Sequence, residues 1–344
     1  MIPEDEITKI REELDNCKRP LFFFHDDADG LCSFLLFYRY KIEGKGIVVK
    51  THPGMDSRFA KKVEEYGPDK VFILDVPVVD QEFFDKVAEL NVPCFWIDHH
   101  NPAPVQHAVT FNPRKHDPDD DTCITRVCYE VVKRDIWIAM VGAIGDWQKP
   151  DYWNDFIEEY PDLLDKSIKE QKDALFASRL GELVKVFSFV LKGATSEVIK
   201  CMKVLTRIES PYEILDQKTP KGRFIHKRYE MINRYYDELL SKGLEKVTKK
   251  MMVVFIYKGE KYSFSSELAN ELLYKYPSKI IIVGREKAGE IKFSIRATDK
   301  LIPPALEKAL NDVEGYGGGH EHACGACVKA DDAKKFLEEL EKAL

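Results

Sequence analysis

No stretch of the sequence approaches the roughly 18 consecutive apolar residues of a membrane-spanning helix, so we expect no membrane partner. The chain also lacks internal repeats and low-complexity linkers, which excludes a repeat architecture. Its first residues, Met-Ile-Pro-Glu-Asp-Glu, are acidic, whereas a secretory signal peptide begins basic and continues apolar. The sequence therefore predicts a protein without a signal peptide.

Cysteines are present, but their spacing does not predict a disulfide framework. The eight are scattered and most lie in apolar stretches, which favours buried thiols in a reducing cytoplasm. Cys324 and Cys327 have the spacing of half a zinc site or of a redox pair. No second pair has a fitting spacing and the neighbouring residues are small, so tight packing is the preferred interpretation. The cysteines in apolar stretches include Cys32, Cys94, Cys128 and Cys201.

Length and charge set limits on the molecule. With 344 residues, 44% of them hydrophobic, the chain is long enough for about two domains with real cores. Its formal net charge is −7, so its surface as a whole does not attract nucleic acid. A polyanion would have to be held by a local basic patch or by bound cations.

One basic segment is interleaved with aromatic residues, a pattern typical of binding to single-stranded nucleic acid. The alternative is a solvated helix face whose apolar residues lie in the core, and the residues alone favour neither interpretation. The segment contains Lys218, Lys221, Arg223, Phe224, Lys227, Arg228, Tyr229, Arg234, Tyr235 and Tyr236.

Strand and helix patterns alternate through the first part of the chain. This alternation predicts an α/β fold with a doubly wound, mostly parallel sheet in a domain spanning 1–150. A helical connector at 151–250 and a smaller α/β domain at 251–344 are expected to follow. The predicted strands of the first domain include 20–25, 46–51, 70–75, 92–97 and 107–112. The predicted helices are 4–19, 30–42, 56–66, 80–90 and 122–134, with connector helices that include 174–191 and 223–244.

The most informative stretch is 21–30, where an apolar run ends abruptly in His25-Asp-Asp27-Ala-Asp29-Gly30. In open α/β sheets, ligands bind at the carboxyl ends of the strands. Carboxylates crowded there repel one another unless a cation lies among them, and oxygen donors with an imidazole suit Mn²⁺ or Mg²⁺. The alternative is a helix cap, which explains Asp27 or Asp29 but not both of them together with His25.

Three further predicted strands end in ionisable residues. They are 71–74, which runs into Asp75; 94–97, which runs into Asp98-His99-His100; and 136–145, which runs into Asp146. Taken singly, Asp75 or Asp146 is better explained as a turn or cap residue. Two adjacent histidines at a strand end rarely serve packing, however. We therefore predict that four elements deliver metal ligands to one rim of the sheet.

The C-terminal domain carries a glycine-rich stretch, Gly315-Tyr-Gly-Gly-Gly-His320. Consecutive glycines predict a loop whose N–H groups surround an anion, and a plain flexible loop is the alternative. The nearby Ser294-Ile-Arg296 strengthens the anion-binding interpretation. The expected elements of this domain are strands 251–257, 279–284 and 290–297 and helices 266–276 and 304–310.

Together these motifs resemble the DHH family of phosphoesterases, in its RecJ-like branch. The resemblance covers nearly the whole chain, and its first motif contains the Asp-Ala-Asp-Gly of RecJ-like exonucleases. The chain lacks the OB-fold length of bacterial RecJ and is similar in size to archaeal RecJ-like nucleases, a group that includes the Hef-associated nuclease. The motifs that carry the resemblance are His25-Asp-Asp27-Ala-Asp29-Gly30, Asp75, Asp98-His99-His100, Asp146 and Gly317-Gly-Gly-His320.

The resemblance implies a role for each motif residue. One Mn²⁺ or Mg²⁺ would be held by His25, Asp27 and Asp75, and a second by Asp29, Asp75, His99 and Asp146. Asp98 would orient a ligand, and His100 would face the scissile phosphate. The substrate backbone would be bound by Arg296, Gly317, Gly318, Gly319 and His320.

The implied activity is two-metal hydrolysis of phosphodiester bonds in single-stranded DNA or RNA. It would be a 3′→5′ exonuclease of DNA repair or replication, with a repair helicase or nuclease and further copies of itself as partners. One alternative is a phosphodiesterase of short oligonucleotides or other small phosphate esters. An inactive replication scaffold is another, but the chain retains every expected ligand.

Overall fold

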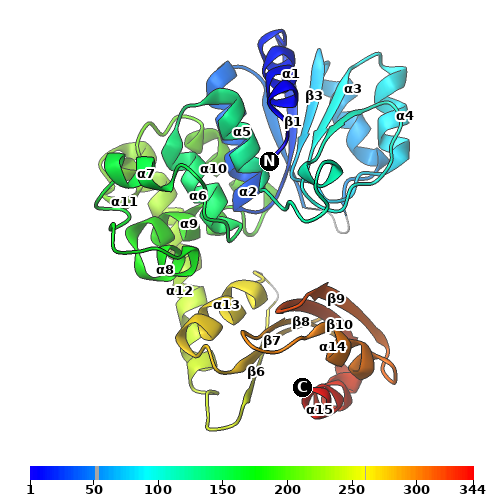
Figure 1. Ribbon diagram of the computed structural model, residues 1–344, viewed down its shortest axis with the longest axis vertical. Coiled ribbons are helices and arrows are strands. Elements are labelled where there is room, and N and C mark those ends of the chain that lie inside the picture. Colours follow the sequence, from blue (N-terminus) through cyan, green and yellow to red (C-terminus); the bar gives the residue numbers. More distant parts are fainter. Residues whose placement is uncertain (51–53, 260) are drawn as a thin grey trace. The chain divides into compact units, whose positions relative to one another are not determined.

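The computed structural model describes residues 1–50, 54–259 and 261–344, in two compact units (Figure 1). The first unit comprises Met1–Leu191 and Thr195–Arg228, and the second comprises Lys192–Ala194 and Tyr229–Leu344. The division falls within the predicted connector 151–250, and the three-domain boundaries stay a prediction. Residue 51, the last of one predicted strand, lies outside the described residues.

The first unit is built around a sheet of five parallel strands, as the alternating pattern predicts. Its strand order is β2-β1-β3-β4-β5. The strands are β1 (Pro20–His25), β2 (Lys45–Val49), β3 (Lys70–Leu74), β4 (Cys94–Ile97) and β5 (Val109–Phe111).

Helices lie between all of these strands except β4 and β5, and then continue without strands to the end of the unit. Between and around the strands lie α1 (Glu4–Asp15), α2 (Ala28–Lys41), η1 (Ser57–Phe59), α3 (Ala60–Tyr66), α4 (Gln81–Glu89) and η2 (Pro113–Lys115). They are followed by α5 (Ile124–Val132), α6 (Ile136–Gly145), α7 (Trp153–Glu159), α8 (Gln171–Ala177), α9 (Arg179–Val190), α10 (Thr195–Leu205) and α11 (Pro211–Leu215). Helix α12 (Pro220–Leu244) begins in the first unit and continues in the second.

Along each strand of the first sheet, side chains alternate between the two faces. Helices pack against both faces. Phe22 and Phe24 of β1 contact Phe34 of α2, with ring centroids 5.8 and 4.8 Å apart. Phe23 takes part in the other core, where its ring centroid lies 5.7 Å from that of Phe83 of α4. The sheet is therefore doubly wound.

The strand order determines where a ligand can approach the first sheet. β1 lies between β2 and β3, so the chain leaves β1 to one side and returns on the other. At such a switch point the connections diverge and leave a crevice outside the carboxyl ends of the strands. His25 ends β1, and Asp75 directly follows β3. The fold thus places both residues at this crevice.

The segment 136–145 forms helix α6, so the predicted strand there is wrong. Residues 136–144 are all buried, and the helix packs against α2, α5 and α9. A helix that is apolar all round shows no alternation, and periodicity alone does not distinguish it from a buried strand. Asp146 accordingly comes from the C-terminal end of a helix.

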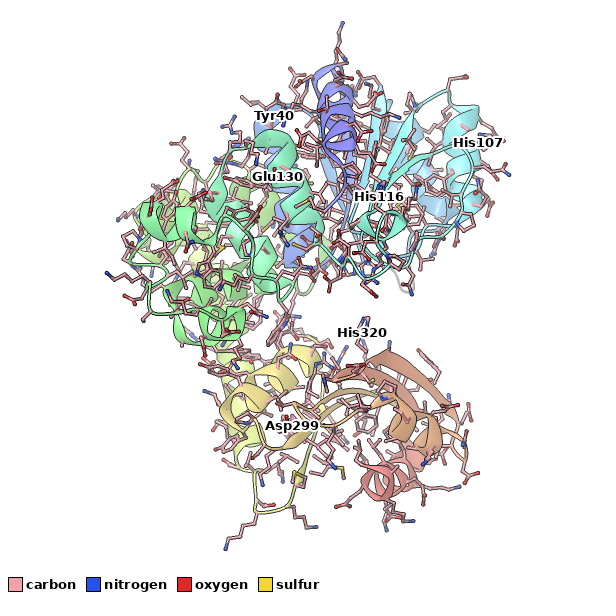
Figure 2. All side chains as sticks on the ribbon, viewed as in Figure 1. Tyr40, His107, His116, Glu130, Asp299 and His320 are labelled. Atoms are coloured by element: carbon pink, nitrogen blue, oxygen red, sulfur yellow. The ribbon has the colours of Figure 1, made fainter. Side chains whose placement is uncertain are left out.

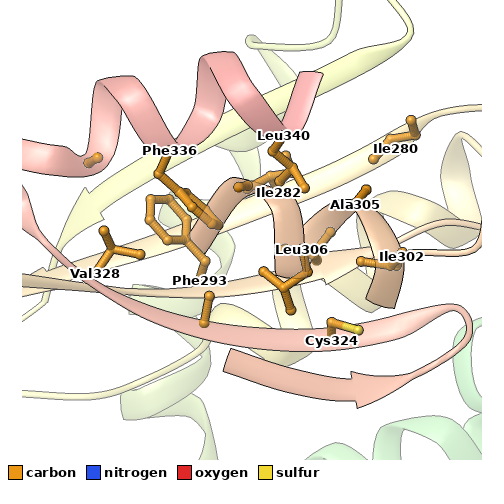
Figure 3. Close-up of a cluster of buried hydrophobic side chains, with 14 of the residues drawn as sticks. Ile280, Ile282, Phe293, Ile302, Ala305, Leu306, Cys324, Val328, Phe336 and Leu340 are labelled. Carbon is orange, nitrogen blue, oxygen red and sulfur yellow. The ribbon is translucent and has the colours of Figure 1, made fainter. Parts of the chain in front are cut away.

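The second unit contains a mixed five-stranded sheet with the order β6-β7-β8-β10-β9, in which β6 and β7 pair in parallel and the other neighbours pair antiparallel. One sheet face packs against α14 and α15, with the Phe293 and Phe336 ring centroids 5.3 Å apart (Figure 3). Neither β10 nor α15 was among the predicted elements. The elements are β6 (Met252–Lys258), α13 (Ser265–Lys275), β7 (Ile280–Lys287), β8 (Glu290–Arg296), α14 (Pro303–Leu310), β9 (Gly315–His320), β10 (Ala323–Lys329), η3 (Ala330–Asp332) and α15 (Ala333–Ala343).

The glycine-rich stretch is the edge strand β9, so the predicted loop is wrong. It pairs antiparallel with β10. A Cβ at Gly317 would lie 2.7 Å from the carbonyl oxygen of Gly325, and one at Gly319 would collide with that of Ala323. Glycine at these two positions lets the strand lie close to its neighbour.

Two further predictions concern packing. All eight cysteines are buried and unpaired, and Cys324 lies in the core between the second sheet and its helices, as the packing interpretation predicts. In the basic segment, Tyr229 and Tyr236 are buried, and the Tyr236 hydroxyl donates a 2.8 Å hydrogen bond to Glu271 Oε2. These two aromatics therefore belong to the core. No helix of the described residues is long and apolar enough to cross a membrane.

Candidate metal centre

The first donors come from the junction of β1 and α2. His25 Nδ1 lies 2.6 Å from Asp27 Oδ2, while Asp27 Oδ1 accepts a 2.9 Å hydrogen bond from the backbone N–H of Gly30. Asp27 is the N-cap of α2. The helix-cap interpretation and the metal-ligand interpretation therefore both apply to Asp27, because one carboxylate oxygen caps the helix and the other faces His25.

Asp29, in the first turn of α2, is only 2% exposed. Its carboxylate accepts hydrogen bonds of 2.8 and 2.7 Å from the backbone N–H groups of Ile124 and Thr125, at the start of α5. The contact joins two helices that are distant in sequence and aims the carboxylate at the sheet rim. Burial and the negative charge of Asp75 raise the pKa of Asp29 to about 7.

Asp75 lies at the centre of the site. Its backbone N–H continues the sheet by donating a 2.9 Å hydrogen bond to the Ile97 carbonyl, and its φ of 59° turns the chain out of β3. Oδ1 lies 3.4 Å from His99 Nε2, and Oδ2 lies 3.6 Å from His25 Nδ1. Burial opposes the charge of this carboxylate, but the two imidazoles outweigh burial and lower the pKa of Asp75. Oδ2 is buried and has no hydrogen-bond partner among the described residues. Such an oxygen is costly to leave unpaired, and a bound cation would satisfy it.

The two histidines after β4 are each fixed through Nδ1. His100 Nδ1 donates to Asp98 Oδ1 at 2.9 Å, and Asp98 Oδ2 accepts the His100 backbone N–H, also at 2.9 Å. His99 Nδ1 lies 2.8 Å from the carbonyl oxygen of Asp121. A carbonyl only accepts, so Nδ1 carries the hydrogen and Nε2 is the nitrogen that faces Asp75. This arrangement is typical of histidines that bind metals.

Asp146 follows the last turn of α6, and Gln148 holds it in place. Gln148 Nε2 donates to the Asp121 carbonyl at 2.5 Å and to Asp146 Oδ2 at 3.3 Å, and Oε1 accepts the Cys123 N–H at 3.0 Å. The same Asp121 carbonyl orients His99. We did not predict a role for Gln148 from the sequence. Two of its four side-chain hydrogen bonds go to backbone groups, and its position two residues after Asp146 is the only feature of the sequence that could have indicated it.

The donors converge in three overlapping groups, in each of which the ligand atoms lie within 4.8 Å of one another. Every predicted metal ligand takes part. His100 also takes part, although the sequence assigns it to the phosphate, so its role stays a prediction, as do the assignments of individual ligands. The groups are His25, Asp27 and Asp75; Asp29, His99 and Asp146; and Asp75, His99 and His100.

Protonation of the histidines indicates how strongly the site attracts positive charge. Burial opposes a charge on His25, but Asp27 and Asp75 outweigh it and raise the pKa of His25 to about 12. Burial likewise opposes a charge on His99, yet the carboxylates led by Asp75 raise its pKa to about 11. Burial and Asp29 raise the pKa of Asp146. Carboxylates with imidazoles are donors that fit Mn²⁺ or Mg²⁺.

The predicted substrate-binding residues lie in the second unit, and Arg296, Gly318 and His320 are on the sheet face opposite the core that α14 and α15 cover. Arg296, Ala323 and His320 are direct cross-strand neighbours, so their side chains share one face. Arg296 Nε donates to Asn270 Oδ1 at 2.8 Å, and Nη1 donates to the carbonyls of Ile295 and Cys324 at 2.9 and 3.1 Å. The guanidinium is thereby held rigidly in place.

Gly318 lies on the same sheet face as His320, whose side chain is exposed (Figure 2). A Cβ added at Gly318 would meet no protein atom within 4 Å, unlike one at Gly317 or Gly319. The fold therefore does not require glycine at position 318. Its absent side chain leaves the strand surface open to a ligand.

Two family models match the chain in tandem. The DHH family N-terminal domain matches residues 21–155, and the DHHA1 domain matches residues 238–344. No curated protein sequence matches the chain significantly. These two matches identify a DHH-family N-terminal domain, which contains the donor set, followed by a DHHA1 domain.

Solved structures share the fold of this chain. RecJ of Thermus thermophilus in complex with Mn²⁺ is similar, with a TM-score of 0.67 and 16% identity. That match covers 98% of this chain and 54% of the other, so this chain spans about half the length of that RecJ. A RecJ exonuclease bound to manganese matches with a TM-score of 0.58 and 15% identity, over 99% of this chain and 94% of the other. The DHH domain of a member of a ribosomal-protein family matches with a TM-score of 0.64 and 15% identity, over 98% and 89%. The chain is a DHH-family protein with a RecJ-like fold.

Proposed function

We propose that this protein is a metal-dependent exonuclease that hydrolyses phosphodiester bonds of single-stranded DNA or RNA in the 3′→5′ direction. One observation carries the proposal. Asp75 takes part in two of the three donor groups, and its buried Oδ2 has no hydrogen-bond partner among the described residues. A carboxylate in this situation suits a position between two cations.

Two Mn²⁺ or Mg²⁺ ions are the proposed cofactors. When bound, such ions would supply positive charge that neutralises the phosphodiester and makes a water acidic enough to serve as the nucleophile. The proposed ligands are His25, Asp27 and Asp75 for one ion and Asp29, Asp75, His99 and Asp146 for the other. Asp29 and His99 reach these positions because backbone groups of the chain fix them: the N–H groups that open α5 and the Asp121 carbonyl.

His100 is the proposed phosphate-contacting residue. Asp98 is bonded to its Nδ1 and to its backbone N–H, so the ring is fixed and Nε2 is the nitrogen that remains. A rigidly held imidazole costs little reorganisation when it meets the phosphate. Asp98 would thus act through His100 and would not bind a metal itself.

The sheet surface around Gly318 is the proposed binding site for the phosphate backbone. Gly318 leaves space above the strand, while Arg296 and His320 contribute basic groups on the same face. We propose that Gly317 and Gly319 serve this surface indirectly, because they allow β9 to pair closely with β10.

The motif pattern supports a place among archaeal RecJ-like nucleases of DNA repair or replication. A repair helicase or nuclease and further copies of the chain are the proposed protein partners. The eight free cysteines suit a reducing compartment such as the cytoplasm.

The test is digestion of DNA and RNA strands of about 20 nucleotides, labelled at each end in turn, with Mn²⁺ or Mg²⁺. The proposal predicts ladders that shorten from the 3′ end. Asp75→Asn is the inactive variant, and Asp80→Asn, an exposed aspartate outside the donor groups, is the matched control. Faster hydrolysis of a dinucleotide than of the strand would identify a small-substrate phosphodiesterase instead. Inactivity towards every substrate would favour the scaffold alternative.

A further inference from the structure

A tryptophan directly follows the candidate ligand Asp146, at a backbone position that favours glycine. Gln148 N–H donates to the Ala143 carbonyl at 2.8 Å and Trp147 N–H donates to the Ile144 carbonyl at 3.1 Å, which together form a Schellman motif that closes α6. Trp147 is the left-handed residue of this motif, with a φ of 59°. Glycine usually occupies that position because a side chain is strained there.

The strain at Trp147 calls for a compensating role for its side chain. Bulky residues with positive φ are uncommon, and where they occur they are enriched at functional sites. Burial in the core offsets little of this backbone strain, because the side chain of Trp147 remains 38% exposed. Its ring lies against Phe176 of α8, with centroids 5.9 Å apart and planes inclined at 58°.

The other three tryptophans are buried. Trp96, Trp137 and Trp153 are 4%, 2% and 3% exposed. The single exposed tryptophan of the chain is therefore the one adjacent to a candidate metal ligand. Consecutive Cα atoms lie about 3.8 Å apart, so the backbone of Trp147 is directly adjacent to that of the candidate ligand Asp146.

We propose that Trp147, backed by Phe176, is a stacking subsite for the nucleobase next to the bond that is cleaved. An aromatic face binds every base, because each base has a π-face, and it binds an unpaired base more readily than a stacked and paired one. The subsite would select single strands over duplexes and would tolerate any sequence. This inference rests on the proposed nuclease function and adds a base contact to a site otherwise built from metal ligands and phosphate contacts.

The first test uses tryptophan fluorescence. Since only Trp147 is exposed among the four tryptophans, rapid mixing of the protein with a short single strand in Mg²⁺ buffer should quench the emission of that residue. A strand of the same length made of abasic sugar-phosphate should quench much less. Equal quenching by both strands, or no quenching by either, would overturn the subsite.

The second test pairs substrate changes with protein changes. Abasic sites are placed singly at each of the first few positions from the cleaved end, and kcat/KM is compared for wild type, Trp147→Phe and Trp147→Leu. Loss of a base–aromatic stack corresponds to about 5- to 150-fold in affinity. We expect an abasic site at one position to lower kcat/KM by that factor for wild type and for Trp147→Phe. The same abasic site should leave kcat/KM of Trp147→Leu unchanged.

The control and the alternatives are separable. Tyr276→Leu, which removes another exposed aromatic, should keep the wild-type abasic penalty. If strands are degraded normally but Trp147→Leu shows the same penalty as wild type, the stacking inference fails and the nuclease proposal stands. If no strand is degraded by wild type, the proposed function fails first. Trp147→Phe keeps an aromatic ring, so a penalty absent from that variant as well would assign the effect to packing and overturn the inference.

Discussion

His99 Nε2 and Asp75 Oδ1 face each other at 3.4 Å, although the hydrogen bond from His99 Nδ1 to the Asp121 carbonyl leaves Nε2 of a neutral ring without a proton. A lone pair and a carboxylate oxygen repel at that distance. The contact is favourable only if the ring takes up a proton or a cation lies between the two atoms. Protons and metal ions therefore compete for this centre.

The first prediction is that metal binding releases protons and strengthens as pH rises. In the metal-free protein the pKa values of His25 and His99 are raised to about 12 and about 11, so both rings are protonated at neutral pH. A divalent ion must displace those protons. Calorimetric titration with Mg²⁺ in two buffers of different ionisation enthalpy should show proton release, and the affinity should be higher at about pH 8 than at about pH 6. Equal affinity at both pH values would contradict the competition.

The second prediction concerns stability without metal, and its sign follows from the same groups. A group whose pKa is raised in the folded state stabilises it below the unfolded pKa and loses that contribution as pH rises. The pKa of Asp29 is raised from 3.8 to about 7, so its stabilising contribution is lost between about pH 4 and 7. The contributions of His25 and His99 are lost from about pH 6.5 upward. In EDTA the melting temperature should fall from about pH 6 to about pH 8. Added Mg²⁺ should raise it more at the higher pH.

The third prediction is that Asp75→Asn lowers hydrolysis by at least about 100-fold while the fold is retained. Bound metal ions would supply several kcal/mol of transition-state stabilisation, and Asp75 is the carboxylate proposed to bind both of them. Asparagine tolerates the φ of 59° at this position, so the backbone should not change. Circular dichroism in EDTA checks the fold. Asp80→Asn should behave as wild type, and near-normal cleavage by Asp75→Asn would remove Asp75 from the centre.

The sequence predicted the architecture well where polarity switches at a strand end. His25 ends the buried strand β1, Asp75 and Asp98 follow β3 and β4, and parallel strands bring their carboxyl ends to one rim. The sequence placed Asp146 at this rim as the end of a predicted strand, but the apolar run before it is a helix. The inference survived because the run ends at Asp146 in either case.

Contacts made by backbone groups could not be predicted. Gln148 acts through the Asp121 carbonyl and the Cys123 N–H, and Asp29 acts through N–H groups of α5. Every residue carries such groups, so no residue type marks them in a sequence. The glycine-rich stretch was misassigned for a related reason. Its glycines meet backbone atoms of β10, and a strand can form only because that neighbour is present.

The fourth prediction separates two roles for His100. Its Nδ1 is bonded to Asp98, while its ligand atom also lies within 4.8 Å of Asp75 and His99, so Nε2 is free either for a phosphate or for a metal. We expect His100→Ala to lower kcat by roughly 100-fold, as for loss of a proton-transferring or charge-stabilising group, with little change in metal affinity. Titration with Mn²⁺ followed by electron paramagnetic resonance measures that affinity. Lost metal binding would reassign His100 to the ligands, and His107→Asn, an exposed histidine outside the donor groups, is the control.

The last prediction uses neighbouring glycines of β9 as a matched pair. A methyl group at Gly318 meets no protein atom within 4 Å, whereas one at Gly317 would lie 2.7 Å from the Gly325 carbonyl oxygen. Gly318→Ala should therefore keep the wild-type melting temperature and raise KM for a single strand by roughly 10- to 100-fold through displacement of the backbone phosphate. Gly317→Ala should lower the melting temperature. Arg296→Ala is a less clean probe, because it also deprives the Ile295 and Cys324 carbonyls of a donor. Wild-type KM in a stable Gly318→Ala protein would show that substrate does not contact this strand.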